Sequence, residues 1–221
     1  MSAADEAKDT PQRPKAEPSR EEPRPTPRSN RDVALIALLT LGLVALDLGT
    51  KAWAESALSR ERLGTRPEVC SMVDGMLQWQ RRPNDGIVLV DGMFELTYAE
   101  NCGAAFSLLN DAPRPVALGL FGTVAVLATV ALFWGLKTGT GGSYYAAAVP
   151  LVASGALGNL ADRVRYGYVV DFIHAHWEGV FDYPVFNVAD IAVVVGVVLL
   201  VIDSFRTRPR AQPTPAEPKP A

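Results

Sequence analysis

The stretch FNVADIAVVVGVVLLVIDSF (residues 186–205) decides the fold of this 221-residue chain. Between Asp190 and Asp203 it holds no charged side chain, and about 20 mostly apolar residues are what a helix needs to cross a bilayer. Three other stretches are also mostly apolar, at residues 33–54, where Asp47 and Lys51 interrupt the run, 115–136 and 144–160. The sequence therefore predicts an all-α polytopic membrane protein with four transmembrane helices.

Two terminal segments have the opposite composition. Residues 1–31 contain six prolines and residues 206–221 contain five, with many charged residues and almost no large apolar side chains. Such segments bury too little apolar surface to offset the entropy lost on folding, so we expect disordered tails flanking a membrane domain at residues 32–205. The net charge of −3, without a basic stripe, argues against a nucleic-acid partner.

Basic residues predict the orientation of the helices. They flank the membrane domain on both sides, at Arg20, Arg24, Arg28, Arg31, Arg206, Arg208 and Arg210. By the positive-inside rule both tails are cytoplasmic, so residues 55–112 and 161–185 are external. A cleaved signal peptide is the alternative for the first helix, because Ala52-Trp53-Ala54 resembles a cleavage site, but Asp47 and Lys51 precede it.

The first external segment is too long for a simple connector. Its runs at residues 76–80, 86–90 and 94–98 alternate or are β-branched, and turn residues separate them. We therefore expect a small external β-sheet on the membrane surface, within about residues 60–112. Cys70 and Cys102 both lie in this region and can form a disulfide in an external compartment, which the sequence does not decide.

Polar residues concentrate at the external ends of the predicted helices and in the external segments. They are Asp47, Lys51, Asn101, Asn159, Asp162, Arg163, Asp171, Asn187 and Asp190. Ionisable groups at membrane depth are costly and usually functional. The simpler interpretations are an interfacial position for Asp47, a structural ion pair between Asp162 and Arg163, and a helix cap for Asn187. A cap does not account for Asp190, one turn deeper.

Two external carboxylates, Asp171 and Asp190, suggest acid–base chemistry on a peptide or ester, because a close pair shares one proton. His174 and His176 would face the same side of an extended segment, but two ligands make a poor metal site, which favours a surface role. A transporter or channel with an acidic external vestibule, or a structural scaffold, is the alternative function.

Five motifs occur in order: DLGTK (47–51), NCGAAF (101–106), GALGNLADR (155–163), GYVVDF (167–172) and FNVAD (186–190). With them, residues 33–205 resemble the lipoprotein signal peptidases (signal peptidase II), four-span aspartyl peptidases of bacterial membranes. The segment between Lys51 and Asn101 is longer than is typical of that family. The proline-rich tails have no counterpart in the motifs.

The resemblance implies a catalytic dyad of Asp171 and Asp190. It implies that the site is shaped or lined by Asp47, Lys51, Asn101, Gly103, Asn159, Arg163 and Asn187. It also implies an activity, removal of signal peptides from diacylglyceryl-modified prolipoproteins by cutting on the N-terminal side of the lipidated cysteine, without metal or organic cofactor. We accordingly expect a monomer in the bacterial cytoplasmic (inner) membrane, with lipidated prolipoproteins and membrane lipids as partners.

Overall fold

The structure is a computed structural model that describes residues 27–74, 76–103, 114–177 and 179–206. The predicted tails lie almost wholly outside these ranges, as do residues 104–112 of the predicted external region. Four helices are described: α1 (Asn30–Leu58), α2 (Arg114–Thr138), α3 (Ser143–Arg165) and α4 (Val188–Arg206). Helix α1 begins three residues before the predicted start, because the Ser29 hydroxyl caps it by accepting a hydrogen bond from the Asp32 amide at 3.1 Å.

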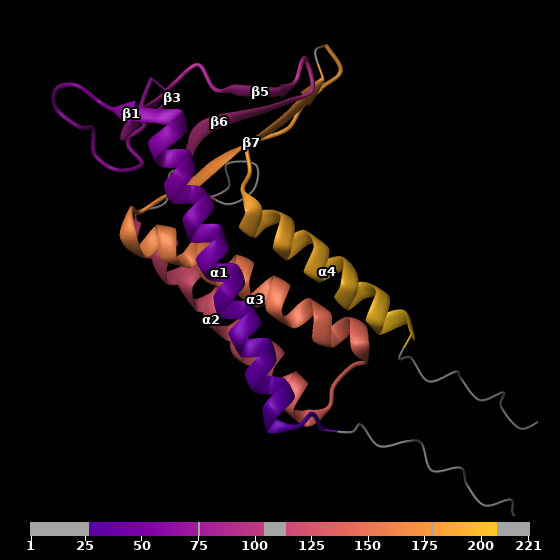
Figure 1. Ribbon diagram of the computed structural model, residues 1–221. Coiled ribbons are helices and arrows are strands. Elements are labelled where there is room, and N and C mark those ends of the chain that lie inside the picture. Colours follow the sequence, from indigo (N-terminus) through magenta and orange to yellow (C-terminus); the bar gives the residue numbers. More distant parts are fainter. Residues whose placement is uncertain (1–26, 75, 104–113, 178, 207–221) are drawn as a thin grey trace, which may run out of the picture.

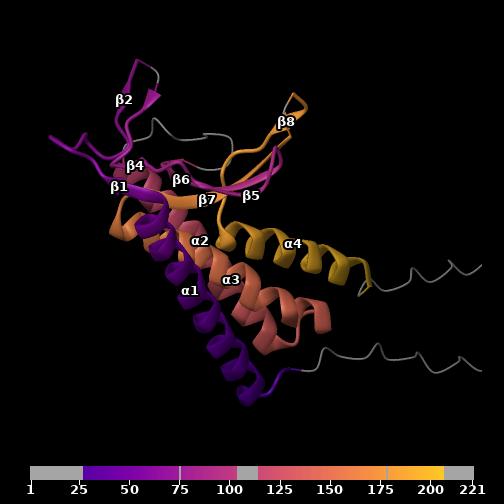
Figure 2. The same cartoon turned by 45° about the horizontal axis from the view of Figure 1, so that its top comes forward.

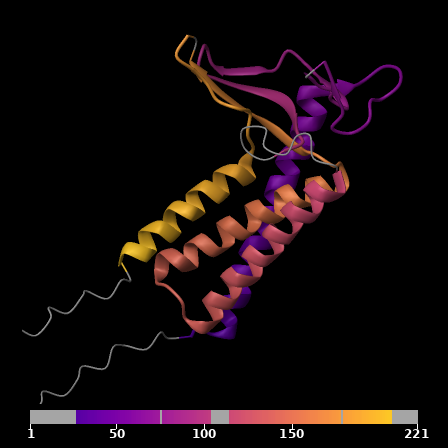
Figure 3. The ribbon, with the colours of Figure 1, turned by 180° about the vertical axis from the view of Figure 1, so that it is seen from behind.

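Helix α3 lies at the centre of the bundle and packs against the other three helices (Figures 1 and 3). Helices α1, α2 and α4 are long and apolar enough to cross a membrane, whereas α3 does not reach that hydropathy. The reason lies in its surroundings, since α3 presents small and polar residues such as Ser154 and Asp162 to its neighbours. The four predicted helices are thus present, and composition supports a membrane span for three of them.

Glycines set the close approach of α3 to α4. A Cβ atom on Gly155 would lie 2.4 Å from the Ala189 carbonyl oxygen, and one on Gly196 would lie 2.6 Å from Val152 Cγ2. Small residues at helix interfaces let backbones approach, which is a common way of packing helices in membranes. This contact brings the first turn of α4, with Asp190, against the middle of α3.

A four-stranded antiparallel sheet covers the end of the bundle where α1 ends and α4 begins (Figure 1). Its order is β5 (Ile87–Val90), β6 (Phe94–Asn101), β7 (Val169–Trp177) and β8 (Phe181–Asp182). Two short strand pairs accompany it: β1 (Ser59–Glu61) with β4 (Arg81–Pro83), and β2 (Met72–Val73) with β3 (Met76–Leu77). Figure 2 shows the β2–β3 and β7–β8 hairpins projecting away from the helices.

The predicted small sheet is confirmed in part. Strands β5 and β6 lie where they were expected, but the sheet is completed by β7 and β8, from residues 161–185, where no strand was predicted. That prediction was incomplete because the run VVDFIHAHW (169–177) places polar residues among its apolar ones. Pairing of β7 with β6, with Asn101 opposite Val169, decides its conformation.

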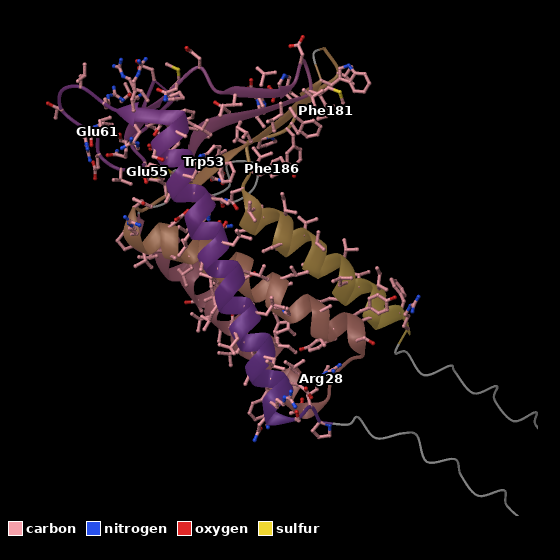
Figure 4. The ribbon with its side chains drawn as sticks, viewed as in Figure 1. Arg28, Trp53, Glu55, Glu61, Phe181 and Phe186 are labelled. Atoms are coloured by element: carbon pink, nitrogen blue, oxygen red, sulfur yellow. A yellow bond between two sulfur atoms is a disulfide. The ribbon has the colours of Figure 1, made fainter. Side chains whose placement is uncertain are left out.

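The main buried apolar cluster lies between the end of α1 and the sheet. Leu58 on α1 packs with Tyr98, Val170 and Phe172 from β6 and β7. Trp53 meets Phe172 edge to face, with ring centroids 6.4 Å apart, and Figure 4 shows Trp53 at this junction. This cluster fixes β7, and therefore Asp171, over the helix ends.

A disulfide between Cys70 and Cys102 ties the segment between β1 and β2 to the end of β6. The sequence left this pairing open. The bond lies directly before Gly103, so it restrains the chain that leaves β6 beside Asn101.

At the opposite end of the bundle, the Asp203 carboxylate accepts hydrogen bonds from the backbone amides of Gly142 and Tyr145, at 3.0 and 3.2 Å. Arg28, which Figure 4 shows at this end, donates to the Gly142 carbonyl at 2.9 Å. These contacts join the start of α1, the turn between α2 and α3, and the end of α4.

Candidate active site

The polar residues predicted to lie at one depth meet where α1, α3 and α4 converge under β7. Asp171 is on β7 and is 1% exposed. Asp190 is in the first turn of α4 and is partly exposed. One carboxylate is therefore enclosed by protein while the other remains accessible from outside.

Asn187 connects the two aspartates. Its side-chain Nδ2 donates to Asp171 Oδ1 at 2.6 Å, and its backbone amide donates to Asp190 Oδ2 at 3.1 Å. The side chain is fully buried, so its geometry is fixed by these bonds and not by water. The two carboxylates consequently lie on either side of one residue.

The second oxygen of Asp171 accepts a hydrogen bond from Asn101 Nδ2 at 3.0 Å. Burial raises the pKa of Asp171 to about 7, and the negative charge of Asp190 acts in the same direction. The hydrogen bonds from Asn101 and Asn187 and the charge of Lys51 oppose this shift. Asp171 can therefore carry a proton close to neutral pH.

Asp190 forms a reciprocal cap with Asn187. Asn187 Oδ1 accepts from the Asp190 amide at 3.1 Å, while Asp190 Oδ2 accepts from the Asn187 amide. This is a capping box, in which the residue three positions into the helix returns a bond to the cap. The expectation that capping cannot account for Asp190 is therefore wrong. The other oxygen, Oδ1, accepts from Asn159 Nδ2 at 2.8 Å.

Lys51 is a buried cation beneath the dyad. Its ammonium lies 2.9 Å from Asp47 Oδ2 and 3.1 Å from Asp162 Oδ2, and its side chain is 2% exposed. It also donates to Asn159 Oδ1 at 2.8 Å. Asn187 Nδ2 donates to the same oxygen at 3.1 Å. With its oxygen held by both groups, Asn159 turns its amide nitrogen toward Asp190, so Lys51 and Asn187 together orient this donor to the dyad.

Asp47 and Asp162 each hold the backbone directly before one dyad aspartate. Asp47 Oδ1 accepts from the amide of Ala189 at 3.0 Å, and Asp162 Oδ2 accepts from the amide of Val170 at 3.1 Å. The Lys51 ammonium therefore holds the two carboxylates that fix the backbone directly before Asp190 and Asp171. Among the described residues Asp162 pairs with Lys51, so the ion pair expected between Asp162 and Arg163 is not the one that forms.

Arg163 instead holds the chain after β6. Its Nη2 donates to the Gly103 carbonyl at 2.6 Å, and its guanidinium lies 4.2 Å from the centre of the Phe121 ring. The Gly103 amide in turn donates to Asn101 Oδ1 at 3.2 Å. Arg163 therefore positions Asn101, which bonds to Asp171. The rest of the predicted motif, residues 104–106, lies outside the described residues.

We expect Gly158→Ala to disturb this arrangement, because its Cβ would lie 2.3 Å from Asp47 Oδ2. Overpacking of this kind costs about 1–3 kcal/mol, and displacement of Asp47 would also release the Ala189 amide. Thermal unfolding and cleavage assays would measure both effects. Gly119→Ala on α2 is the matched control, since nothing lies within 4 Å of its Cβ position. Equal stability of the two variants would contradict the expected clash.

The chain matches the family whose model is described as Signal peptidase (SPase) II over residues 39–206. A lipoprotein signal peptidase of Geobacter sulfurreducens is 42% identical over 127 residues, which are 58% of this chain and 78% of that protein. One of Pseudomonas syringae pv. tomato is 36% identical over 171 residues, 77% of this chain and 85% of that protein.

The fold also has a solved counterpart. A structure described as a bacterial membrane enzyme superposes with a TM-score of 0.56 at 23% identity, covering 80% of this chain and 93% of that one. The family match spans every polar residue of the site, from Asp47 to Asp190. The chain therefore belongs to the signal peptidase II family and is a bacterial membrane peptidase.

Proposed function

We propose that this protein is an aspartic endopeptidase that removes signal peptides from diacylglyceryl-modified prolipoproteins, cutting on the N-terminal side of the lipidated cysteine. The observation that carries the catalytic assignment is the placement of buried Asp171 and partly exposed Asp190 on either side of Asn187. The names of the relatives as lipoprotein signal peptidases support the substrate class.

In the proposed reaction Asp171 begins protonated and Asp190 ionised. Asp190 takes a proton from a water molecule whose oxygen attacks the scissile carbonyl carbon, and Asp171 gives its proton to the carbonyl oxygen. The tetrahedral intermediate collapses when the proton on Asp190 passes to the leaving nitrogen and Asp171 takes back the hydroxyl proton. Both aspartates thus return to their starting states.

The surrounding amides support these roles. Asn101 and Asn187 hold the Asp171 carboxyl in one orientation, and Asn159 does the same for Asp190. Arg163 Nε is buried and has no hydrogen-bond partner among the described residues. It is therefore a candidate donor to substrate. All these groups come from one chain, which fits activity as a monomer.

The proposed membrane placement follows from the bundle. We propose that α3 crosses the membrane with α1, α2 and α4, because it lies among them and is shielded from lipid. Basic residues then place both termini in the cytoplasm, in the bacterial inner membrane. The dyad lies at the sheet end of the bundle, so it faces the external side, where the lipid anchor of a substrate would hold the scissile bond at a matching depth.

A reporter that is active only in the cytoplasm tests this topology. Fusions at residue 1, within residues 137–143 and after Arg206 should be active, because α1 begins, α2 joins α3 and α4 ends at the end of the bundle opposite the sheet. A fusion near Asp85, in the segment between β4 and β5, should be inactive. Activity of the Asp85 fusion, or release of residues 1–54 as a cleaved peptide, would overturn the four-span placement.

The function itself is tested with one prolipoprotein in two forms, lipidated and unlipidated. Purified full-length protein should release the signal peptide from the lipidated form only, with the new N-terminus at the modified cysteine. Equal cleavage of both forms would show that the enzyme does not require a lipidated substrate. If neither form is cleaved, the result would favour the alternative functions, a transporter or channel or a structural scaffold.

The raised pKa of Asp171 predicts the pH dependence of kcat/KM. Because Asp171 must hold a proton, kcat/KM should fall as pH rises through about 7, approaching a tenfold loss per pH unit. Asn101→Ala removes a hydrogen bond that favours the ionised form, so the pKa of Asp171 should rise and the falling limb should move to higher pH.

The control for this shift is Asn84→Ala, because the Asn84 side chain is exposed and donates to the Ala57 carbonyl at the end of α1. It should leave the limb in place. A limb that moves to lower pH in Asn101→Ala would show that the titrating group is not Asp171 acting as an acid.

A further inference from the structure

Four polar side chains gather on one face of the sheet, apart from the dyad. Glu95 on β6 is the register partner of His174 on β7, and His176 is the partner of Asp182 on β8. Residues opposite one another share a face, as do residues two apart on a strand. All four therefore project from the same face, while Asp171, three residues from His174, points to the other.

The distances within this cluster suit metal coordination. His174 Nδ1 lies 2.8 Å from Glu95 Oε1, and His174 Nε2 lies 2.7 Å from Asp182 Oδ1. One potential ligand atom from each of Glu95, His174 and His176 lies within 4.8 Å of the other two. Their common centre is less than about 3 Å from each, so small side-chain movements would give the roughly 2.1 Å bonds of zinc.

His176 provides separate evidence for a metal site. Its Nδ1 is buried and has no hydrogen-bond partner among the described residues. Its ring is 4.6 Å from that of His174. Both histidines line a cavity of about 490 Å³ that the β7–β8 hairpin forms with Gly92. A buried ring nitrogen without a partner, beside a second histidine and a carboxylate, has the surroundings of a ligand.

We propose that Glu95, His174 and His176 bind a divalent transition-metal ion of the zinc class. Two histidines and one glutamate form a zinc donor set that leaves a fourth position for water. Asp182 accepts from the distal nitrogen of His174 and orients it, as carboxylates do for metal-bound histidines. Metal binding displaces the proton between His174 Nδ1 and Glu95, which is released to solvent. The ion joins β6 to the β7–β8 hairpin, and its binding does not depend on the proposed peptidase activity.

The test uses the full chain in detergent, carrying a tag without histidine and stripped of metal with a chelator. The chain has only two histidines, so no other histidine competes. Titration with Zn²⁺ against a chromophoric chelator should give one ion per chain. His176→Ala and Glu95→Gln should each weaken binding at least about 100-fold, and Asp182→Asn by about 10–100-fold. Glu61→Gln, an exposed external carboxylate in β1, should bind as the parent does.

Two readouts separate coordination from misfolding. Co²⁺ should give the intense visible bands of a four-coordinate site in the parent but not in His176→Ala. Without metal, the variants should unfold within a few degrees of the parent, so that lost binding reflects lost ligands. Binding of less than one ion per chain, or equal affinity for His176→Ala and Glu61→Gln, would overturn the proposal.

Discussion

Asp171→Asn and Asp190→Asn are each expected to lower the rate of signal-peptide cleavage by about three orders of magnitude or more. General acid and general base each contribute about 10²–10⁴-fold, and the proposed reaction uses one carboxyl in each role. The amide can neither give the proton that Asp171 holds nor accept one from water as Asp190 does. Single-turnover cleavage of a lipidated prolipoprotein measures the loss directly.

Loss of stability in these variants must be separated from loss of catalysis. Both oxygens of Asp171 accept hydrogen bonds from amide nitrogens, so an asparagine there would point a donor at a donor. Unfolding should therefore be measured beside activity. Asp203→Asn is the matched control, since Asp203 is 4% exposed and accepts backbone hydrogen bonds at the opposite end of the bundle. It should lose stability but keep its cleavage rate per folded molecule.

Near-normal cleavage by either dyad variant would overturn the mechanism. Asp162→Asn provides a second comparison, because Asp162 accepts from the Val170 amide and pairs with Lys51, and neither partner is a reacting group in the proposed reaction. Its effect on cleavage should be milder than that of either dyad variant. Complete loss with normal folding would require a different assignment of the dyad.

The four helices could be predicted because a long apolar run depends only on composition within one window. Long apolar runs predicted the four helices, and the positions of Lys51 and Asp190 at helix ends predicted that they meet. The low hydropathy of α3 did not prevent the prediction of a helix there. Its small and polar residues face other helices, so the requirement for an apolar surface is relaxed there.

The contacts that complete the site depend on pairings between distant segments, which no local pattern contains. Asn101 bonds to Asp171 across 70 residues because β6 and β7 pair with a bulge between Leu96 and Ala99. On the other side of this bulge the same two strands set Glu95 opposite His174, which adds a carboxylate to the two histidines and makes a three-ligand cluster. Without β7 recognised as a strand, neither contact could be inferred.

Capping and ion pairing were also ambiguous in the sequence. Asp162 stands beside Arg163 in the chain, but adjacent residues on a helix do not face each other. The structure brings Asp162 to Lys51 and Arg163 to the Gly103 carbonyl instead. Similarly, Asp190 is three residues after Asn187, and this spacing suits both a catalytic role and a capping box. In the structure its Oδ2 accepts from the Asn187 amide and its Oδ1 accepts from the Asn159 side chain.

Lys51→Met is expected to lower the free energy of unfolding by about 3–5 kcal/mol, because it leaves the carboxylates of Asp47 and Asp162 buried without their shared cation. In a domain of this size the thermal midpoint should fall by about 10 °C or more. Lys137→Met, at an exposed position on α2 where the ammonium bonds Asn30, should change stability by less than about 0.5 kcal/mol.

A triple variant separates the role of Lys51 in folding from its role in the site. Lys51→Met combined with Asp47→Asn and Asp162→Asn leaves no uncompensated charge, so it should recover much of the lost stability. It should not recover the full cleavage rate, because the Asn159 oxygen loses the ammonium and keeps only the hydrogen bond from Asn187 Nδ2 at 3.1 Å, which weakens the hold on the nitrogen that donates to Asp190. If the triple variant is no more stable than Lys51→Met alone, buried charge is not the cause of the loss. If it cleaves at the normal rate, Lys51 does not orient Asn159 for catalysis.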